Sequence, residues 1–240
     1  MDLHHRVAVV TGASSGIGAA IARELSAAGV RLVVTARRAE RLQALCESLP
    51  GPSGWLAAAA EDPATPKALL DLALDRFGQA DILVNNAGVF VAGGVDTIDL
   101  DEIAQMTRVN FDAVVRASYV FGRHFKAQAN GAIVNVSSIG AYLSSSSVGV
   151  YSGLKHALEV FTSSLRVELS ASGVRVGTIA PGTTDTEIFD RLRGSGRAVK
   201  ADHTAPLEPG DVAAAVRFML ERPERANVAR MLLVSSTESV

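Results

Sequence analysis

The sequence predicts a single α/β domain built on a doubly wound parallel sheet of about seven strands, with helices on both faces. Short runs of apolar, mostly β-branched residues recur along the chain, and segments with apolar residues at helical spacing separate them. The short runs are apolar at successive positions, which is typical of strands buried on both faces of a parallel sheet. Regular alternation of such strands with helices favours a sheet that is covered on both sides.

The expected strands follow one another at intervals that leave room for a helix between them. They are VAVVT (7–11), RLVVTA (31–36), WLAAAA (55–60), DILVNN (81–86), GAIVNVS (131–137), VRVGTIA (174–180) and ARMLLVS (229–235). The run WLAAAA would also suit a helix, because alanine is the strongest helix former.

The expected helices occupy the stretches between these strands. Helical spacing of apolar residues covers 16–29, 38–49, 65–78, about 99–127 and about 151–171. Gly29, Gly78 and Gly173 stand where helices should stop, because glycine is favoured just after a helix C-terminus.

One irregular segment, residues 183–209, follows the sixth strand and mixes charged residues with Gly and Pro. A segment of this length without regular structure is usually disordered or a functional lid. Because it emerges at the carboxyl end of a parallel strand, we predict a lid over the substrate. No linker or composition break divides the chain, so we expect residues 1–240 to form one domain.

The composition argues against several classes of function. The formal net charge is −2, so a general binder of nucleic acid or of an anionic membrane is not expected. Cys46 is the one cysteine, so we expect no intrachain disulfide and no cysteine-based metal cluster. His4 and His5 are more typical of a frayed terminus than of a metal site, so we expect no metal. The amino-terminal residues contain no long apolar stretch, so neither a signal peptide nor a spanning helix is expected. These features fit a cytoplasmic protein.

The stretch TGASSGIG (11–18) follows the first strand and opens the first helix, as a dinucleotide-binding loop requires. Gly12 permits a tight turn, Gly16 lets the backbone approach a pyrophosphate, and Gly18 lets helix and sheet pack closely. The helix N-terminus offers unpaired N–H groups to the phosphates. Flexible turns also use glycine, but the strand before and the helix after favour a cofactor site. The expected contacts are Gly12, Ser14, Ser15, Gly16, Ile17 and Gly18.

The end of the second strand indicates which dinucleotide binds. In NAD-binding sheets an acidic residue about 20 positions after the loop holds the ribose 2′-hydroxyl. Here that position is Ala36, followed by Arg37 and Arg38. Guanidinium groups in place of a carboxylate suit a 2′-phosphate, which arginine can bind through two hydrogen bonds. We therefore predict NADP(H), mainly through Arg37, whereas Arg38 could equally be a solvated residue at a helix start.

The stretch YSGLKHALEV (151–160) sets a phenol and an ammonium group one helical turn apart. Side chains at positions i and i+4 share a helix face, so Tyr151 and Lys155 are expected to be neighbours. One interpretation is a surface tyrosine beside a solvated lysine. The other is an acid–base pair, in which Lys155 lowers the pKa of Tyr151 from about 10 toward neutrality.

Taken together, the motifs resemble the single-domain short-chain dehydrogenases/reductases, whose fold is a Rossmann-type sheet. The resemblance runs from about Arg6 to the C-terminus, and it rests on TGASSGIG, NNAG (85–88), Asn110, Ser138, Tyr151-x-x-x-Lys155 and Pro181-Gly182 in this order and spacing. It implies an NADP(H)-dependent oxidoreductase that interconverts a small carbonyl compound and a secondary alcohol or hydroxy acid. It also selects the acid–base interpretation of the Tyr151–Lys155 pair.

By this resemblance Tyr151 would be the acid in reduction and the base in oxidation, because a carbonyl oxygen needs a proton once the carbon has received a hydride. Lys155 would also hold the ribose hydroxyls of the nicotinamide half. Ser138 would hydrogen-bond the substrate oxygen, although the adjacent Ser137 could take this part. Asn110 would hold a water that relays protons; the alternative is a polar residue tolerated at a helix–helix contact.

Further cofactor contacts are implied in the same way. They are Asp62, Asn86, Ala87, Gly88, Pro181, Gly182, Thr184 and Thr186. Asp62 would meet the adenine, although EDPAT departs from the family's Asp-Val-Thr pattern and the helix after it looks short. Asn85, in contrast, would brace the sheet.

Other functions remain open from the sequence alone. A 3-oxoacyl carrier-protein reductase would usually end in a Gly-rich stretch, whereas this chain ends ERPERANVARMLLVSSTESV. A protein that senses NADP(H) without turnover is the second alternative, against which the complete Asn-Ser-Tyr-Lys set argues. The substrate pocket would be lined by 91–94, 140–147 and the lid, and the serines at 144–147 suit either a small polar substrate or a solvated loop.

Self-association is expected from the two longest helices, about 99–127 and about 151–171. They carry apolar residues around more of their circumference than one sheet face can cover. Surplus apolar surface of this kind often marks an interface, and the resemblance implies a homodimer or homotetramer.

Overall fold

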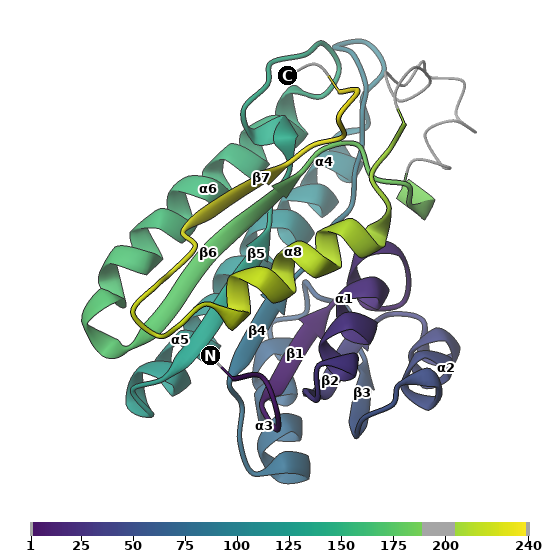
Figure 1. Cartoon of the computed structure of the whole chain (residues 1–240). Helices are drawn as coiled ribbons and strands as arrows, with labels where there is room; N and C mark the ends of the chain where they lie inside the picture. Colours follow the sequence, from purple (N-terminus) through teal and green to yellow (C-terminus); the bar gives the residue numbers. More distant parts are fainter. Residues whose placement is uncertain (1, 189–204, 239–240) are drawn as a thin grey trace.

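A computed structural model describes residues 2–188 and 205–238, and its centre is a seven-stranded parallel sheet (Figure 1). The strands are β1 (Val7–Thr11), β2 (Arg31–Ala36), β3 (Ser53–Ala57), β4 (Ile82–Asn85), β5 (Gly131–Val136), β6 (Val174–Pro181) and β7 (Arg230–Leu233). They lie in the order β3-β2-β1-β4-β5-β6-β7, and each neighbouring pair is parallel. The predicted doubly wound sheet is confirmed.

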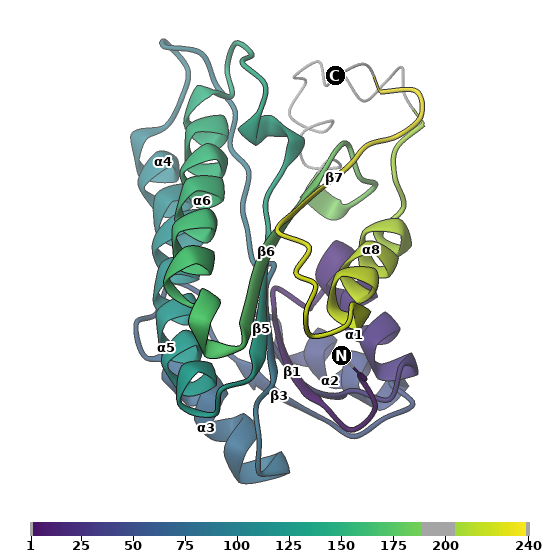
Figure 2. The same ribbon diagram turned by 60° about the vertical axis from the view of Figure 1, so that its left-hand side comes forward.

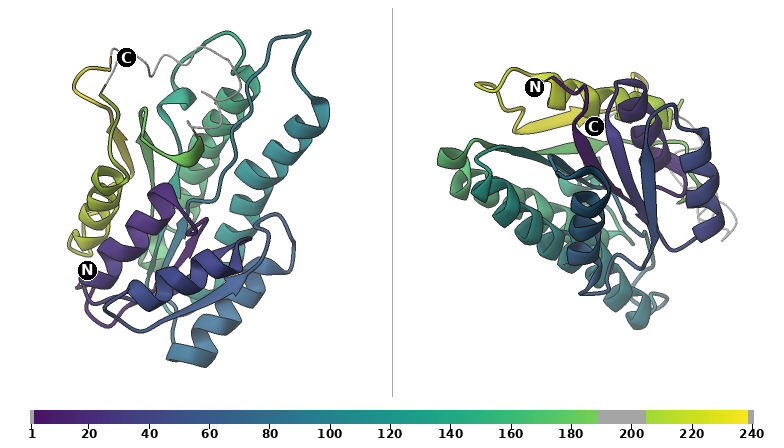
Figure 3. Two further views of the ribbon diagram at one scale, coloured as in Figure 1. Left: turned by 90° about the vertical axis from the view of Figure 1, so that its right-hand side faces the viewer. Right: turned by 90° about the horizontal axis from the view of Figure 1, so that it is seen from below.

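Helices cover both faces of the sheet (Figures 2 and 3). One face carries α1 (Gly16–Ala27), α2 (Ala39–Ser48) and α8 (Pro209–Glu221), and the other carries α3 (Thr65–Phe77), α4 (Leu100–Thr107), α5 (Ala113–Ala127) and α6 (Gly149–Glu168). A separate buried cluster lies under each layer, with Ile21 and Leu25 in the first and Phe121 and Leu165 in the second. None of the helices in the described ranges is both long enough and apolar enough to span a membrane.

The burial of the strands follows the expected pattern. Every residue of β1, β4, β5 and β6 is buried, which explains why their sequences are apolar at successive positions. Exposure alternates in β7, because this strand lies at the edge of the sheet.

Several elements differ from the sequence-based expectation, and α8 was not among the expected helices. The long helix expected at about 99–127 is divided by a π-helical turn, η1 (Arg108–Asp112), between α4 and α5. The third strand starts at Ser53 and ends at Ala57, so the last alanines of the 55–60 run leave the sheet. The helix after Asp62, which looked short, spans 13 residues. The glycine stops are confirmed, since Gly29, Gly78 and Gly173 all have φ between 72° and 82°.

The winding of the chain reverses between β1 and β4. The first three strands extend from β1 toward one edge, and the later strands extend from β4 toward the other. In open parallel sheets, ligands bind outside the carboxyl ends of the strands at such a reversal. The loops after β1 and β4 therefore mark the place to look for a site.

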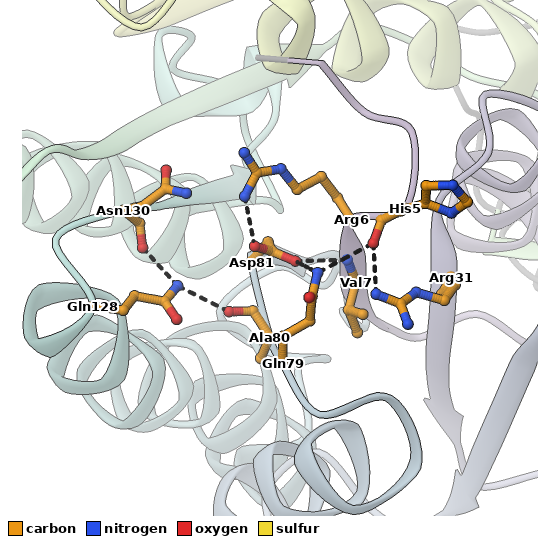
Figure 4. Close-up of polar contacts among 9 residues, drawn as sticks. All are labelled: His5, Arg6, Val7, Arg31, Gln79, Ala80, Asp81, Gln128 and Asn130. Carbon is orange, nitrogen blue, oxygen red and sulfur yellow. Dashed lines mark hydrogen bonds and ion pairs between the residues drawn. The ribbon is translucent and has the colours of Figure 1, made fainter.

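A buried carboxylate ties β1 to β4 at the opposite, amino-terminal edge (Figure 4). Asp81 is 5% exposed and accepts hydrogen bonds from Arg6 Nη1 at 2.9 Å, from the Val7 backbone N–H at 2.8 Å and from Gln79 Nε2 at 2.8 Å. The backbone N–H of Asp81 in turn donates to the Val7 carbonyl at 2.9 Å. These bonds set the register of the two strands whose other ends form the reversal.

We predict that Asp81→Ala lowers the free energy of unfolding by about 3 kcal/mol, because it leaves a buried N–H and a guanidinium group without their acceptor. Urea unfolding followed by circular dichroism measures the change. The control is Asp71→Ala, which removes an exposed ion pair with Lys67 and should cost less than about 0.5 kcal/mol. Equal losses in the two variants would contradict the structural role of Asp81.

Candidate active site

The glycine loop lies against the segment that follows β4. Thr11 Oγ1 accepts the backbone N–H groups of Asn86 and Ala87, each at 3.0 Å. The Asn86 side-chain amide donates to the Thr11 carbonyl at 2.9 Å. Gly12 has a φ of 69°, and a Cβ there would lie 2.7 Å from the Ala87 Cα. A side chain at position 12 would therefore force the two segments apart.

The first turn of α1 packs against the place where the glycine loop meets the segment after β4. A Cβ on Gly18 would lie 2.4 Å from the Gly12 carbonyl oxygen and from Asn86 Nδ2. Gly18 thus allows the helix to approach the loop and Asn86, rather than the sheet itself as expected. Ser15 precedes the helix without a side-chain cap, so the first N–H groups of α1 have no such partner and suit an anion.

Of the two predicted arginines, Arg38 rather than Arg37 lies against this loop. Arg37 is exposed and makes no hydrogen bond or ion pair with the described residues. Arg38 donates to Ser14 Oγ through Nε at 3.2 Å and Nη2 at 2.9 Å, and to Ser15 Oγ through Nη2 at 2.8 Å. The structure therefore favours Arg38, which the hydroxyls of the loop hold in place, while the cofactor contact of Arg37 stays a prediction.

A second arginine, Arg41, was not expected at the site. Arg38 Nη1 forms an ion pair with Glu187 Oε2 at 2.9 Å, and Arg41 Nη1 pairs with the other carboxylate oxygen. Hydrogen bonds from Arg41 and then Arg38 hold the pKa of Glu187 down to about 2. A signal was present in the sequence, because Arg41 stands three residues after Arg38, in the first turn of the helix that Arg38 precedes.

Ser138, Tyr151 and Lys155 come together at the carboxyl ends of β5 and β6. Ser138 follows β5, and its Oγ accepts the N–H of Gly140 at 3.0 Å. A Cβ on Gly140 would lie 3.3 Å from Tyr151 Cε1 and 3.4 Å from Ser138 Oγ, so the tyrosine ring and the serine border the same space. Lys155 Nζ lies 5.8 Å from the centre of the Tyr151 ring and donates to the Val136 carbonyl at 2.9 Å.

The two candidate serines have different surroundings. Ser138 forms the hydrogen bond that acts on the Tyr151 hydroxyl. Ser137 is 3% exposed, and its Oγ has no hydrogen-bond partner among the described residues. The contact with Tyr151 therefore favours Ser138 as the residue that meets a substrate.

The pKa of Tyr151 is shifted upward rather than downward. Burial of the hydroxyl raises it above its usual value near 10, and the hydrogen bond with Ser138 opposes this rise. Lys155 does not reverse this rise, and its ammonium group donates to the Val136 carbonyl at 2.9 Å. The expected lowering by Lys155 is therefore wrong for this structure. Burial lowers the pKa of Lys155 itself to about 8, against the opposing charge of Glu159.

Asn110 lies within the π-helical turn η1 and is 1% exposed. Its Oδ1 accepts the N–H of Val89 at 2.8 Å, and its Nδ2 donates to the Val89 carbonyl at 2.7 Å. The side chain thus holds the segment after NNAG in place and is not simply tolerated between helices. Single π turns often occur at functional sites, since they redirect one side chain.

A buried chain of amides and hydroxyls connects the sheet to the helices of the site. Asn85 Nδ2 donates to Asn135 Oδ1 at 2.8 Å and to Ser118 Oγ at 3.1 Å. Asn135 Nδ2 donates in turn to Thr162 Oγ1 at 2.8 Å. Asn85 therefore braces the sheet as expected, and it links β4 and β5 to α5 and α6.

Glu159 is a buried charge that the sequence analysis missed. It stands one turn after Lys155 in α6 and is 2% exposed. Its Oε2 accepts from Thr178 Oγ1 at 2.8 Å and from Arg230 Nε at 3.1 Å. Together with burial, Glu159 raises the pKa of the nearby Tyr142 to about 12. Its negative charge also partly offsets the cost of burying Lys155.

The expected contact between Asp62 and adenine has no support from the local geometry. Asp62 is exposed, and its Oδ1 accepts the N–H of Ala64 at 2.9 Å. The carboxylate closes the turn before α3, and the adenine contact stays a prediction.

The other expected contacts border the glycine loop from the side of β6. Pro181 ends that strand, and the N–H of Gly182 donates to the Leu233 carbonyl at 2.7 Å. Thr184 is buried, and its Oγ1 donates to the Gly182 carbonyl at 3.0 Å. Thr186 Cγ2 lies 3.1 Å from the position that a Cβ would take on Gly16, so it covers the loop.

The described ends of the predicted lid are tied together, while its centre, 189–204, lies outside the described residues. Thr184 and Leu207 form a parallel bridge, and the Leu207 N–H donates to the Thr183 carbonyl at 2.8 Å. Glu238, near the C-terminus, accepts from Thr183 Oγ1 at 2.9 Å. Both ends of the segment are thus anchored beside the carboxyl end of β6.

Two loops border Tyr151 on the side predicted for the substrate. The N–H of Gly93 donates to the Ser147 carbonyl at 2.8 Å, which joins the expected 91–94 and 140–147 linings. Phe90 packs edge-on against the Tyr151 ring at 4.6 Å between ring centres. Ser144–Ser147 are exposed. Within the described ranges, no group of three or more His, Cys, Asp or Glu residues is suited to a metal ion.

Comparison with known proteins decides the family. The model of the short chain dehydrogenase family matches residues 6–195. The chain belongs to the short-chain dehydrogenase/reductase family. An uncharacterized oxidoreductase of Staphylococcus saprophyticus is 32% identical over 232 residues, covering 95% of this chain and 96% of that protein.

Solved structures of this family share the whole fold. A serine dehydrogenase complexed with NADP⁺ superposes with a TM-score of 0.90 at 27% identity, covering 98% of this chain and 96% of that one. A 3-ketoacyl-(acyl-carrier-protein) reductase from Brucella melitensis, complexed with NADH, superposes with a TM-score of 0.87 at 25% identity, covering 98% of each chain. The chain is therefore a short-chain dehydrogenase/reductase over its described length.

We predict that Glu159→Gln lowers the pKa of Lys155 below its value of about 8, because it removes the charge that opposes the effect of burial. A pH titration of labelled lysine side chains by NMR measures this change. The control is Glu168→Gln at the exposed end of α6, which should leave the pKa of Lys155 unchanged. An unchanged Lys155 in the Glu159 variant would show that the two groups are not coupled.

Proposed function

We propose that this short-chain dehydrogenase/reductase uses NADP(H) to interconvert a small carbonyl compound and a secondary alcohol or hydroxy acid. The observation that carries the proposal is the placement of Ser138 and Lys155 around Tyr151 at the carboxyl edge of the sheet. Ligands bind at that edge in open parallel sheets. The serine dehydrogenase complexed with NADP⁺, similar over nearly the whole chain, supports both the cofactor and the substrate class.

The residues of the chain fit NADP(H). The glycine loop and the uncapped first turn of α1 would hold the pyrophosphate. Arg38 and Arg41 already bind an anionic group, the Glu187 carboxylate, so their geometry suits the 2′-phosphate. On the other side, Lys155 and the turn after β6 would hold the nicotinamide half.

The residues around Tyr151 can deliver a proton to a carbonyl oxygen. The hydride for the carbonyl carbon would come from NADPH when it is bound. Tyr151 is protonated at neutral pH, because burial raises its pKa, and its hydroxyl would then donate to the oxygen. Ser138 would hydrogen-bond the same oxygen and orient it. Lys155, whose pKa is about 8, is mostly cationic at pH 7 and would hold the ribose hydroxyls of the nicotinamide half.

A proton must then return to Tyr151 from solvent. We extend the proposal to Asn110, which would hold a water between Lys155 and the outside. Its two bonds to the Val89 backbone fix the side chain at the end of β4, where such a water would have a rigid partner.

Two alternatives differ in what they require. A 3-oxoacyl carrier-protein reductase is favoured by the similarity to the Brucella protein, and it would act on 3-oxoacyl thioesters. A protein that senses NADP(H) without turnover needs only the cofactor contacts. The proximity of Ser138, Tyr151 and Lys155 argues against the second alternative, because cofactor binding alone does not require a serine beside the tyrosine hydroxyl.

We also propose that copies of this chain associate with one another. The outer faces of α5 and α6 expose Tyr119, Val160 and Val167, at 41%, 55% and 64%. Exposed apolar side chains on two adjacent helices favour burial against a second copy of the chain. We expect a homodimer or homotetramer built on these faces.

We predict that Tyr151→Phe lowers the turnover of a good carbonyl substrate by at least about 100-fold, because it removes the proton donor but keeps the ring. NADPH affinity should stay within about threefold, whereas Lys155→Met should lose both turnover and affinity. Fluorescence titration of NADPH beside steady-state rates measures both effects. The control is Tyr119→Phe, on the exposed face of α5, which should change neither. Near-normal turnover in Tyr151→Phe would refute the proposed role.

We predict that Arg38→Leu weakens NADPH binding by about tenfold or more and leaves NADH binding unchanged, because only NADPH carries the 2′-phosphate. Arg37→Leu is the matched control and should change either affinity less than twofold, since Arg37 makes no polar contact with the described residues. A larger loss in Arg37→Leu would return the site to the sequence-based assignment. Equal affinity of the unaltered protein for both cofactors would contradict the choice of NADP(H).

A further inference from the structure

The carboxylate of Glu187 occupies the position between two guanidinium groups that would bind the 2′-phosphate. Glu187 comes from the segment after β6, and its partners come from the end of β2 and the first turn of α2. Arg38 has its remaining donors committed to the hydroxyls of Ser14 and Ser15, so Nη1 is the group that it turns toward an anion.

We propose that Glu187 is an internal competitor of the 2′-phosphate, which NADP(H) must displace from Arg38 and Arg41. This inference rests on the proposed function. A carboxylate and a phosphate monoester accept the same charge-assisted hydrogen bonds from guanidinium groups, and one pair of arginines cannot serve both fully. The competition applies only to a ligand with a 2′-phosphate, so Glu187 reduces the advantage of NADP(H) over NAD(H).

The same contact holds the neighbouring chain over the cofactor loop. Thr186 lies next to Glu187, and its Cγ2 is 3.1 Å from the position of a Cβ on Gly16. Thr183 and Thr184 are anchored independently, by Glu238 and by Leu207. The described turn after β6 is thus held at one end by these bonds and at the other by the arginines. Displacement of Glu187 would release the end that lies over the glycine loop.

The solvent exposure of the three side chains limits how much Glu187 can weaken NADPH binding. The side chains of Arg38, Arg41 and Glu187 are 36%, 49% and 40% exposed, so each ion pair is weakened by solvent. Two such pairs together support a competition of about three- to tenfold in affinity. The carboxylate stays ionised throughout the neutral range, because its pKa is held to about 2.

Glu187→Gln tests the proposal in direct binding measurements. Isothermal titration calorimetry with NADPH, NADH, adenosine 2′,5′-bisphosphate and 5′-AMP separates ligands that carry the 2′-phosphate from those that do not. The expected result is a three- to tenfold gain in affinity for NADPH and the bisphosphate, with NADH and 5′-AMP within twofold. The matched control is Asp185→Asn, which removes the same charge two residues earlier from an exposed side chain and should change every affinity less than twofold.

The same substitution in an Arg41→Gln protein tests whether Glu187 acts on NADPH binding through the arginine pair. In Arg41→Gln the competitor has lost one of its two partners, so the gain from Glu187→Gln should shrink. An undiminished gain in this background would show that Glu187 does not act through the arginine pair.

Several results would overturn the inference. Unchanged or weaker NADPH binding in Glu187→Gln would exclude competition, and an equal gain in Asp185→Asn would leave only a general charge effect. Weaker NADH binding would show that Glu187 holds ribose hydroxyls instead. If the unaltered protein binds neither dinucleotide, the proposed function fails; if it prefers NADPH and Glu187→Gln changes nothing, the inference alone fails.

Discussion

The contact between β1 and β4 at their carboxyl ends supports every other part of the site. Thr11 Oγ1 accepts two consecutive backbone N–H groups, those of Asn86 and Ala87, and so holds the loops after both strands in one arrangement. The winding of the sheet reverses here, because the chain leaves β1 and β4 toward opposite edges of the sheet. The loops after the two strands therefore diverge and leave room for a ligand between them. Asp81 joins the same two strands at their other ends, so the reversal is braced from both sides.

From this junction, buried polar bonds extend to the catalytic helix. Asn85 and Asn135 connect β4 and β5, and Thr162 takes the connection into α6. Lys155 in the same helix donates to the carbonyl of Val136 at the end of β5. Buried amides and ammonium groups are costly without such partners, so the position of α6 on the sheet is closely specified.

Much of the fold was predictable from local pattern. Strand order along the chain, the helix stops at glycine and the approximate seven strands follow from periodicity and turn residues. The π turn at Asn110 was not, because helical spacing of apolar residues continues through it. The extra residue shows only in the hydrogen bond from the Ala113 N–H to the Arg108 carbonyl. Pairs distant in sequence were also hidden. Glu187 lies 149 positions from Arg38, and Glu159 meets Arg230 across 71 positions. The direction of the Tyr151 pKa shift depends on burial, which the sequence does not display.

The most direct test of the central claim is NADPH oxidation by the purified protein against a panel of ketones, aldehydes, keto acids and 3-oxoacyl thioesters. The loss of NADPH absorbance is followed with and without each compound. The account predicts oxidation well above the background rate with at least one small ketone, aldehyde or keto acid. Oxidation with 3-oxoacyl thioesters alone would point to the carrier-protein reductase, and tight NADPH binding without oxidation by any compound would contradict an enzymatic role.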